Sequence, residues 1–111
     1  MIISTHVLDT TRGRPAAGLA VTLRRRGGDG EWLVVGRAVT DADGRVKDLS
    51  NGVVAAGDYR LEFATGKYFT DSGTDVFYPE VFVAVAAGDG EGHLHVPLLL
   101  SPFGYSTYKG T

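Results

Sequence analysis

The chain has 111 residues, 43% of them hydrophobic and 22% charged, a composition that excludes an intrinsically disordered chain and predicts a single domain over residues 1–111. The formal net charge of −2 argues against a nucleic-acid partner, because nucleic-acid binding needs a basic surface. The absence of cysteine excludes disulfides, thiolate catalysis and cysteine–zinc sites, and it fits a reducing compartment. No segment approaches the roughly 20 apolar residues that cross a bilayer, so we expect a cytoplasmic protein without a membrane partner.

Sixteen glycines are spread along the chain as turn signals, and apolar residues alternate with polar ones between them. Alternation with a period of two is typical of half-buried β-strands. The expected strands lie, in chain order, at residues 2–8, 19–24, 32–40, 45–49, 59–63, 81–85, 93–100 and 105–108. The run of β-branched and aromatic residues around 81–85 predicts a deeply buried strand, and residues 66–75 leave room for a helical turn or two. Short strands separated by frequent turns favour an all-β sandwich.

The strand expected over residues 93–100 indicates where two of the three histidines point. Its apolar positions from Leu94 to Leu100 alternate with His93, His95 and Pro97. If the apolar positions face the interior of the sandwich, both histidines lie on the opposite, outer face of the sheet. Pro97 shares that outer face and predicts an edge strand or an irregularity in the ladder, because proline has no N–H to donate.

The three histidines, His6, His93 and His95, allow three interpretations. They could be surface or hydrogen-bonded structural residues, they could move protons near neutral pH, or the His93-x-His95 pair could hold a metal on one strand face. No third metal ligand is identifiable in the sequence, so we expect no metal site. Arg45 follows the turn at residues 41–44 and is a candidate to hold an anionic substrate or a developing oxyanion, or else a solvated arginine beside a turn.

The last twelve residues, Leu100-Ser-Pro-Phe-Gly-Tyr-Ser-Thr-Tyr-Lys-Gly-Thr111, carry aromatic and turn residues, whereas chain ends are usually frayed. A terminus of this kind is expected to be anchored and to lie close to a site. No serine is flanked as an activated nucleophile would be, so a hydrolase of this sequence is expected to use an activated water.

Three segments together resemble the transthyretin-like 5-hydroxyisourate hydrolases. These segments are Ile3-Ser-Thr-His-Val-Leu-Asp9, His93-Leu-His-Val-Pro-Leu-Leu-Leu-Ser-Pro102 and Tyr105-Ser-Thr-Tyr-Lys-Gly-Thr111. The resemblance implies a transthyretin-type (prealbumin-like) sandwich of two four-stranded sheets with one short helix. It also implies a homotetramer, a dimer of dimers whose active sites lie in a channel between the dimers, and a reaction without a cofactor. That reaction opens the ring of 5-hydroxyisourate in urate breakdown, giving 2-oxo-4-hydroxy-4-carboxy-5-ureidoimidazoline.

The resemblance also assigns roles to individual positions. The histidine of the family's first-strand motif matches His6, the arginine after its Asp-Gly turn matches Arg45, and the histidine directly before Val-Pro-Leu-Leu matches His95. These three are the implied catalytic residues, and His6 and Arg45 also contact the substrate.

The family's terminal tetrapeptide matches the end of this chain with two departures. Its tyrosine corresponds to Tyr108, and its last residue, usually serine, corresponds to Thr111; both are implied substrate-binding residues. Lys109 stands where arginine is usual, which keeps the charge and loses the planar, bidentate guanidinium.

Two other functions are compatible with the pattern. A transthyretin-like protein without catalysis would hold a small aromatic or heterocyclic molecule in the channel between dimers, and the departures in the tail favour this alternative. A generic adhesion or carbohydrate-binding sandwich would explain the strands, but it would not explain the histidines or the structured tail.

Overall fold

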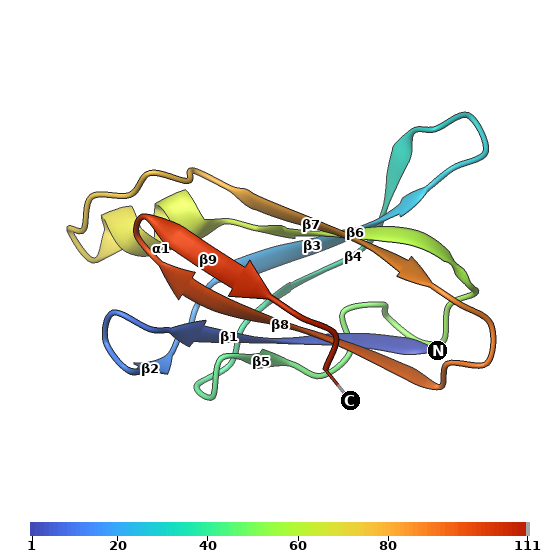
Figure 1. Cartoon of the computed structure of the whole chain (residues 1–111), viewed down its shortest axis with the longest axis horizontal. Helices are drawn as coiled ribbons and strands as arrows, with labels where there is room; N and C mark the ends of the chain where they lie inside the picture. The colour runs from blue at the N-terminus through green and yellow to red at the C-terminus, as the bar shows by residue number, and fades with distance from the viewer. Residues whose placement is uncertain (111) are drawn as a thin grey trace.

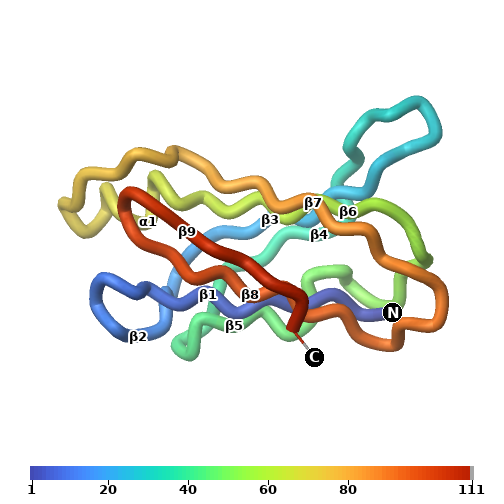
Figure 2. Tube along the Cα trace, viewed as in Figure 1, coloured from blue at the N-terminus to red at the C-terminus, as the bar shows by residue number. Residues whose placement is uncertain are grey.

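The computed structural model describes residues 1–110, and Thr111 lies outside the described residues. Residues 1–110 form nine strands and one short helix. Figure 1 shows that the strands lie in two facing layers, and Figure 2 shows the same path as a trace. The elements are β1 (Ile2–Asp9), β2 (Arg14–Pro15), β3 (Ala20–Arg26), β4 (Trp32–Val39), β5 (Arg45–Val46), β6 (Gly57–Phe63), α1 (Thr65–Asp71), β7 (Val81–Ala87), β8 (His93–Ser101) and β9 (Gly104–Thr107).

The two layers differ in how their strands pair. The first sheet has the order β2-β1-β8-β9, with β5 also paired to β1, and the second has the order β4-β3-β6-β7. Neighbouring strands are antiparallel except β1 and β8, which run parallel from Ile2↔His93 to Asp9↔Leu100. The expected all-β sandwich with one short helix is confirmed, and the first sheet adds the two-residue strands β2 and β5 to its longer ones.

The core fills the space between the sheets and is supplied by alternate residues of the facing strands. The inward residues of β6 and β8, all buried, are Tyr59, Leu61, Phe63, Leu94, Val96, Leu98 and Leu100. Burying each of these large apolar side chains contributes about 1.5–3 kcal/mol to the free energy of unfolding. The outer face of β8 is therefore free to carry polar residues, and the prediction that His93 and His95 lie there is confirmed, since His93 is exposed and His95 half-buried.

The prediction of a deeply buried strand over residues 81–85 is wrong. β7 is an edge strand of the second sheet, and its residues alternate between buried Val81 and Val83 and exposed Phe82 and Ala84. Phe82 is 47% exposed. A run of β-branched and aromatic residues measures how well a segment fits a pleated sheet, whereas the position of a strand within the sheet depends on its partners.

Pro97 shows the irregularity that its sequence position predicted, although β8 is not an edge strand. β8 pairs with β1 on one side and with β9 on the other, and Pro97 is buried. The antiparallel pairing of β8 with β9 ends at Leu98↔Thr107. It resumes in the same register, between β8 and the tail that follows β9, at His95↔Gly110. The ring nitrogen of Pro97 cannot donate in the gap, and its carbonyl accepts instead from the Thr107 hydroxyl at 2.7 Å.

The strand expected over residues 45–49 is limited to Arg45–Val46. The carboxylate of Asp48 accepts hydrogen bonds from the Ser50 hydroxyl at 2.7 Å and from the Gly52 N–H at 2.9 Å. Side-chain bonds of this kind compete with a strand ladder and favour a turn. No helix within residues 1–110 has the length and apolar character needed to cross a membrane.

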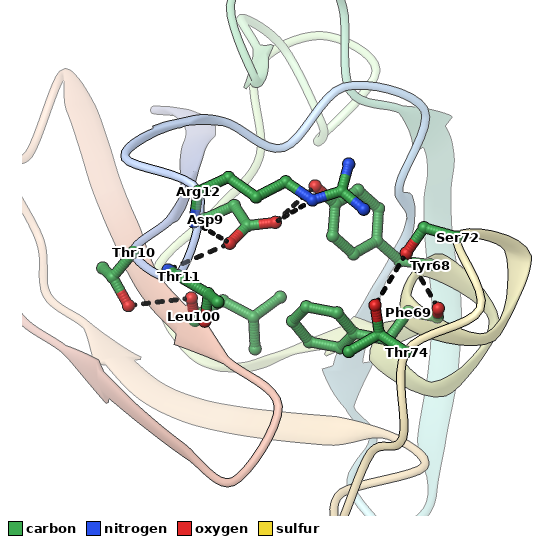
Figure 3. A network of polar contacts seen from close by, with 9 residues as sticks. All are labelled: Asp9, Thr10, Thr11, Arg12, Tyr68, Phe69, Ser72, Thr74 and Leu100. Atoms are coloured by element: carbon green, nitrogen blue, oxygen red, sulfur yellow. Dashed lines mark hydrogen bonds and ion pairs between the residues drawn. The ribbon is translucent and has the colours of Figure 1, made fainter.

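The end of β1 is fixed to α1 by a buried carboxylate. Asp9 Oδ1 accepts from the backbone N–H groups of Thr11 and Arg12 at 3.1 Å, and Oδ2 accepts from the Tyr68 hydroxyl at 2.8 Å (Figure 3). The Asp9 side chain is 0% exposed, and the Arg12 guanidinium lies 3.8 Å from it. Burial and the hydrogen bond to Asp9 raise the pKa of Tyr68 to about 12, so its hydroxyl keeps the proton that it donates.

We expect Tyr68→Phe to lower the free energy of unfolding by about 1.5–3 kcal/mol, since it removes a hydrogen bond to a buried charge. Urea denaturation measures the change. Tyr78→Phe is the matched control, because the half-buried Tyr78 has no hydrogen-bond partner for its hydroxyl among residues 1–110, and it should change stability little. Equal stability of Tyr68→Phe and the wild type would show that the network does not fix α1.

Candidate active site

A hollow of about 820 Å³, which we call the first hollow, opens on the outer face of the first sheet. Its polar lining comes from β1, from β5 and the residue after it, from the loop before β8, from β8 itself and from the tail. These residues are Ser4, Thr5, Arg45, Lys47, Glu91, His93, His95 and Lys109. Five of the eight have basic or imidazole side chains, so the first hollow is suited to an anionic or strongly polar molecule.

The parallel pairing of β1 with β8 brings the first group of these residues together. Ser4 pairs with His95 and Ile2 with His93, and paired residues of neighbouring strands point to the same face. The side chain of Ser4 therefore lies between the two imidazoles. Its hydroxyl oxygen is 2.6 Å from His93 Nε2 and 2.7 Å from His95 Nδ1.

His95 is held in an environment that favours its neutral form. Burial is the largest cause, and the positive charge of Arg45 and the neighbouring imidazoles of His93 and His6 add to it; together they hold the pKa of His95 below its ordinary value. A neutral imidazole at neutral pH can accept a proton, so His95 has the protonation state that a general base requires.

A tight turn places Arg45 beside His6. Asp41 Oδ1 accepts from the N–H groups of Asp43 and Arg45 at 2.9 Å, and Arg45 pairs with His6 across β5 and β1. Gly44 has φ +75°, and a Cβ there would lie 2.4 Å from the carbonyl oxygen of Val7, so only glycine allows this close approach.

His6 has a defined tautomer in this arrangement. Its Nε2 lies 2.8 Å from the carbonyl oxygen of Asp43. A carbonyl oxygen can only accept, so Nε2 carries the hydrogen and, in the neutral ring, Nδ1 is left free to accept. His6 thus pairs with Arg45 across β1 and β5 and has one ring nitrogen available.

The tail is anchored to the same site, as its sequence predicted. The Gly110 N–H donates to the His95 carbonyl at 2.8 Å, and a Cβ on Gly110 would lie 2.7 Å from His95 Cδ2. Glycine therefore lets the tail backbone lie against the imidazole of His95. One residue earlier, the ammonium of Lys109 forms an ion pair with Glu91, which fixes the tail to the loop before β8.

Comparison with known proteins agrees with the resemblance. Residues 3–110 match the model of the HIUase/Transthyretin family. The chain belongs to this family. It is 44% identical over 111 residues to a 5-hydroxyisourate hydrolase of Salmonella typhimurium, covering 99% of this chain and 81% of that one. It is 46% identical over 114 residues to a 5-hydroxyisourate hydrolase of Caulobacter vibrioides, covering 98% and 97%.

Solved structures of the family share the fold. The structure of Klebsiella pneumoniae 5-hydroxyisourate hydrolase superimposes with a TM-score of 0.88 at 35% identity, covering 100% of both chains. The structure of sea bream transthyretin in complex with thyroxine superimposes with a TM-score of 0.92 at 33% identity, covering 100% of this chain and 96% of that one. The family thus includes proteins named as enzymes and a protein solved with a bound hormone.

The positions that the family resemblance assigned fall into three places. Arg45 and His95 line the first hollow, and His6 lies beside Arg45. Tyr108 lines a second hollow of about 310 Å³, together with residues of β7 and the inward face of β8. Thr111 lies outside the described residues. Within residues 1–110, no group of three histidine, aspartate or glutamate side chains is placed to hold a metal ion.

Sequence reasoning did not identify Ser4, Lys47 and Glu91 as part of the site. Ser4 stands two residues before His6 in a strand of period two, so a shared face could have been inferred from β1 alone. Its position between two histidines about 90 residues away follows from the parallel pairing with β8, for which the sequence holds no local signal. The same applies to Lys47 and Glu91, which meet the histidines only through the packing of separate loops.

We expect Gly110→Ala to displace His95 or detach the tail, because the new methyl group has no room beside the imidazole. The histidine ring resonances should shift in NMR spectra while the fold is retained. Gly104→Ala is the matched control on the same tail, since a Cβ there meets only the Ser101 hydroxyl at 3.6 Å. Unchanged His95 resonances in Gly110→Ala would contradict the close approach.

Proposed function

We propose that this protein catalyses the ring-opening hydrolysis of 5-hydroxyisourate to 2-oxo-4-hydroxy-4-carboxy-5-ureidoimidazoline in urate breakdown. The observation that carries the proposal is that His95 and Arg45 line one hollow, with His6 paired to Arg45, in a chain that matches proteins named 5-hydroxyisourate hydrolase over nearly its full length. A neutral imidazole in the same hollow as a guanidinium suits the attack of water on a carbonyl group.

His95 and Arg45 have complementary roles in this reaction. His95 removes a proton from water as the water oxygen attacks the ring carbonyl carbon, and Arg45 stabilises the negative charge that develops on the carbonyl oxygen. The carbon–nitrogen bond then breaks, the nitrogen takes up a proton, and the carbonyl carbon becomes a carboxylate. His6, with its Nε2–H bound to Asp43, orients the substrate and offers Nδ1 as an acceptor to a ring N–H.

The tail and the assembly complete the proposed site. The family resemblance implies that Tyr108 and Thr111 bind the substrate. Tyr108 lines the second hollow, and Lys109 lines both hollows and so lies between the two. We propose a homotetramer, a dimer of dimers. Supporting this, the outer edges of β7 and β9 are unpaired within residues 1–110, and exposed aromatic residues, among them Phe82 and Tyr105, lie on these strands. A cytoplasmic location stays a prediction.

The alternative is a transthyretin-like protein that binds a small molecule without catalysis. The sea bream neighbour was solved with thyroxine, which makes this a reasonable second function for the fold. The site argues for the enzyme, because the lowered pKa of His95 and the adjoining guanidinium serve proton transfer and are not needed to hold an apolar ring.

His95→Asn is expected to lower kcat/KM for freshly generated 5-hydroxyisourate by on the order of 10²-fold or more, the scale at which a general base contributes. The decay of ultraviolet absorbance after uricase treatment of urate measures the rate, and size-exclusion chromatography with light scattering checks that the assembly is intact. No acceleration by micromolar wild-type protein would favour the binding protein, and near-normal turnover by His95→Asn would remove His95 from the mechanism.

The pH dependence of kcat/KM provides a separate prediction. His95 must be neutral to accept a proton, so activity is full above its pKa and is lost as the pH falls through it. The acid limb should therefore lie below about pH 6.5, the ordinary histidine value, because the pKa of His95 is lowered. Arg45→Gln removes one cause of the lowering and should move the limb to higher pH. Arg37→Gln, an exposed arginine on β4, is the control that should leave the limb in place.

A further inference from the structure

The Ser4 hydroxyl lies between two imidazole nitrogens. Its oxygen is 2.6 Å from His93 Nε2 and 2.7 Å from His95 Nδ1, both short enough for good hydrogen bonds. A hydroxyl carries one hydrogen and cannot donate to both rings. If it accepted an N–H from both, its own hydrogen would have no acceptor among residues 1–110, in a residue that is 4% exposed. When both rings are neutral, Ser4 therefore donates to one ring and accepts an N–H from the other. The tautomers of His93 and His95 are therefore coupled through Ser4.

Two arrangements satisfy both ring nitrogens and also use the Ser4 hydrogen. In the first, His95 Nδ1–H donates to the Ser4 oxygen, Ser4 donates to His93 Nε2, and His95 Nε2 is left without a hydrogen. In the second, every donor is reversed: His93 Nε2–H donates to Ser4, Ser4 donates to His95 Nδ1, and His95 carries its hydrogen on Nε2. The first arrangement leaves His95 Nε2 able to accept a proton, and the second leaves it able to donate one.

We propose that Ser4 and His93 form a proton relay with His95, in which Ser4 is a positioning residue that sets the tautomer of His95 and passes its proton to His93. This inference rests on the proposed hydrolysis for its catalytic meaning, while the hydrogen-bond coupling stands on the geometry alone. The relay assigns His93 a role that the family resemblance, which selected His95, left open.

The relay moves one proton from water through His95 and Ser4 to His93. Each bond to hydrogen that breaks is replaced by one that forms. His95 Nε2 takes a proton from water, and His95 becomes an imidazolium ion. The Nδ1 hydrogen of His95 then passes to the Ser4 oxygen as the Ser4 hydrogen passes to His93 Nε2. His95 is left neutral with its hydrogen on Nε2, Ser4 is again a hydroxyl, and His93 carries the positive charge, which it can release as a proton from Nδ1.

The surroundings of the three residues favour transfer in this direction. Ser4 is 4% exposed and His95 half-buried, whereas His93 is exposed and can exchange its proton with water. The charged and titratable groups that face the relay are His6 on β1, Arg45 and Lys47 at β5, Lys109 on the tail and Glu91 in the loop before β8. Burial, Arg45 and the other two histidines all lower the pKa of His95, so a positive charge is disfavoured there.

The geometry of the sheet keeps the hydroxyl between its two partners. Ser4 occupies the outer face of β1, where it pairs with His95 and lies two residues after Ile2, the partner of His93, and both β1 and β8 have a buried opposite face. Neither strand can rotate or slip by one residue without exposing that apolar face. The Ser4 oxygen is thus held within hydrogen-bond distance of both imidazoles. A longer side chain would clash with the rings, and alanine would remove the hydrogen-bond partner that they share.

NMR of the imidazole nitrogens tests the coupling without any substrate. In protein labelled with ¹⁵N, the nitrogen shifts report which ring nitrogen carries hydrogen. We expect Ser4→Ala to change the tautomer populations of both His93 and His95, Ser4→Thr to preserve them, and Ser72→Ala, a serine at the end of α1, to have no effect. His93→Phe should change the tautomer of His95 in the wild-type background and leave it unchanged in the Ser4→Ala background.

Kinetics test the catalytic meaning of the relay. We expect Ser4→Ala to lower kcat by about tenfold with KM nearly unchanged, a part of the 10²–10⁴-fold that acid–base catalysis contributes, and Ser4→Thr to stay within about threefold of the wild type. Tautomers that do not respond to Ser4→Ala, in a protein that hydrolyses 5-hydroxyisourate, would overturn the relay and leave the proposed function standing. A wild-type protein without hydrolysis would overturn the function, and the nitrogen shifts would still decide whether Ser4 couples the rings.

Discussion

The rest of the structure depends on the parallel pairing of β1 with β8. Strands near the two ends of the chain lie side by side over eight residue pairs, from Ile2↔His93 to Asp9↔Leu100, and form the middle of the first sheet. The inward residues of both strands contribute to the core, so the register cannot slip without exposing apolar side chains. The same register fixes the outer face, where it brings Ser4 next to His95. Core packing on one side of two strands thus sets the geometry of the polar site on the other.

Two short segments lie against this pair of strands, each at a glycine. Gly44 lets the turn before β5 lie against the carbonyl of Val7, which places Arg45, and Gly110 lets the tail lie against the imidazole of His95. Both segments lie on a rigid sheet, so the site combines a fixed strand surface with loops that are held by hydrogen bonds. The buried carboxylate of Asp9 has a corresponding structural role at the far end of β1, where it fixes the turn and α1 (Figure 3). The polar groups at this end are therefore used for stability, and those over the middle of the sheet are available for chemistry.

The electrostatics of the first hollow follow from the same arrangement. Arg45, Lys47 and Lys109 line the hollow with two imidazoles, His93 and His95, and the one carboxylate that lines it, Glu91, is paired with Lys109. The excess of positive charge favours a bound anion, and burial and the charge of Arg45 lower the pKa of His95; both effects suit the attack of water on an electron-poor ring carbonyl. The departure from the family's usual arginine at Lys109 has a physical consequence here, because the ammonium forms a point-charge contact with Glu91 where a guanidinium could make a bidentate one. A lysine therefore holds the tail at this contact with less geometric constraint.

The sequence alone determined the features that depend on local periodicity. The alternation from Leu94 to Leu100 predicted the outward direction of His93 and His95, and the missing N–H of Pro97 predicted the interruption of the ladder, because both follow from the two-residue repeat and the chemistry of one residue. The motifs at the two ends of the chain identified the family, and the family resemblance then assigned the candidate residues, Arg45 among them. Only the tertiary structure decided that β7 is an edge strand, that Tyr108 lines a different hollow from His95, and that Ser4 bridges two imidazoles. These features depend on which strands become neighbours and in which register, and that choice is made by packing between residues far apart in the chain, for which a single sequence holds no periodic signal.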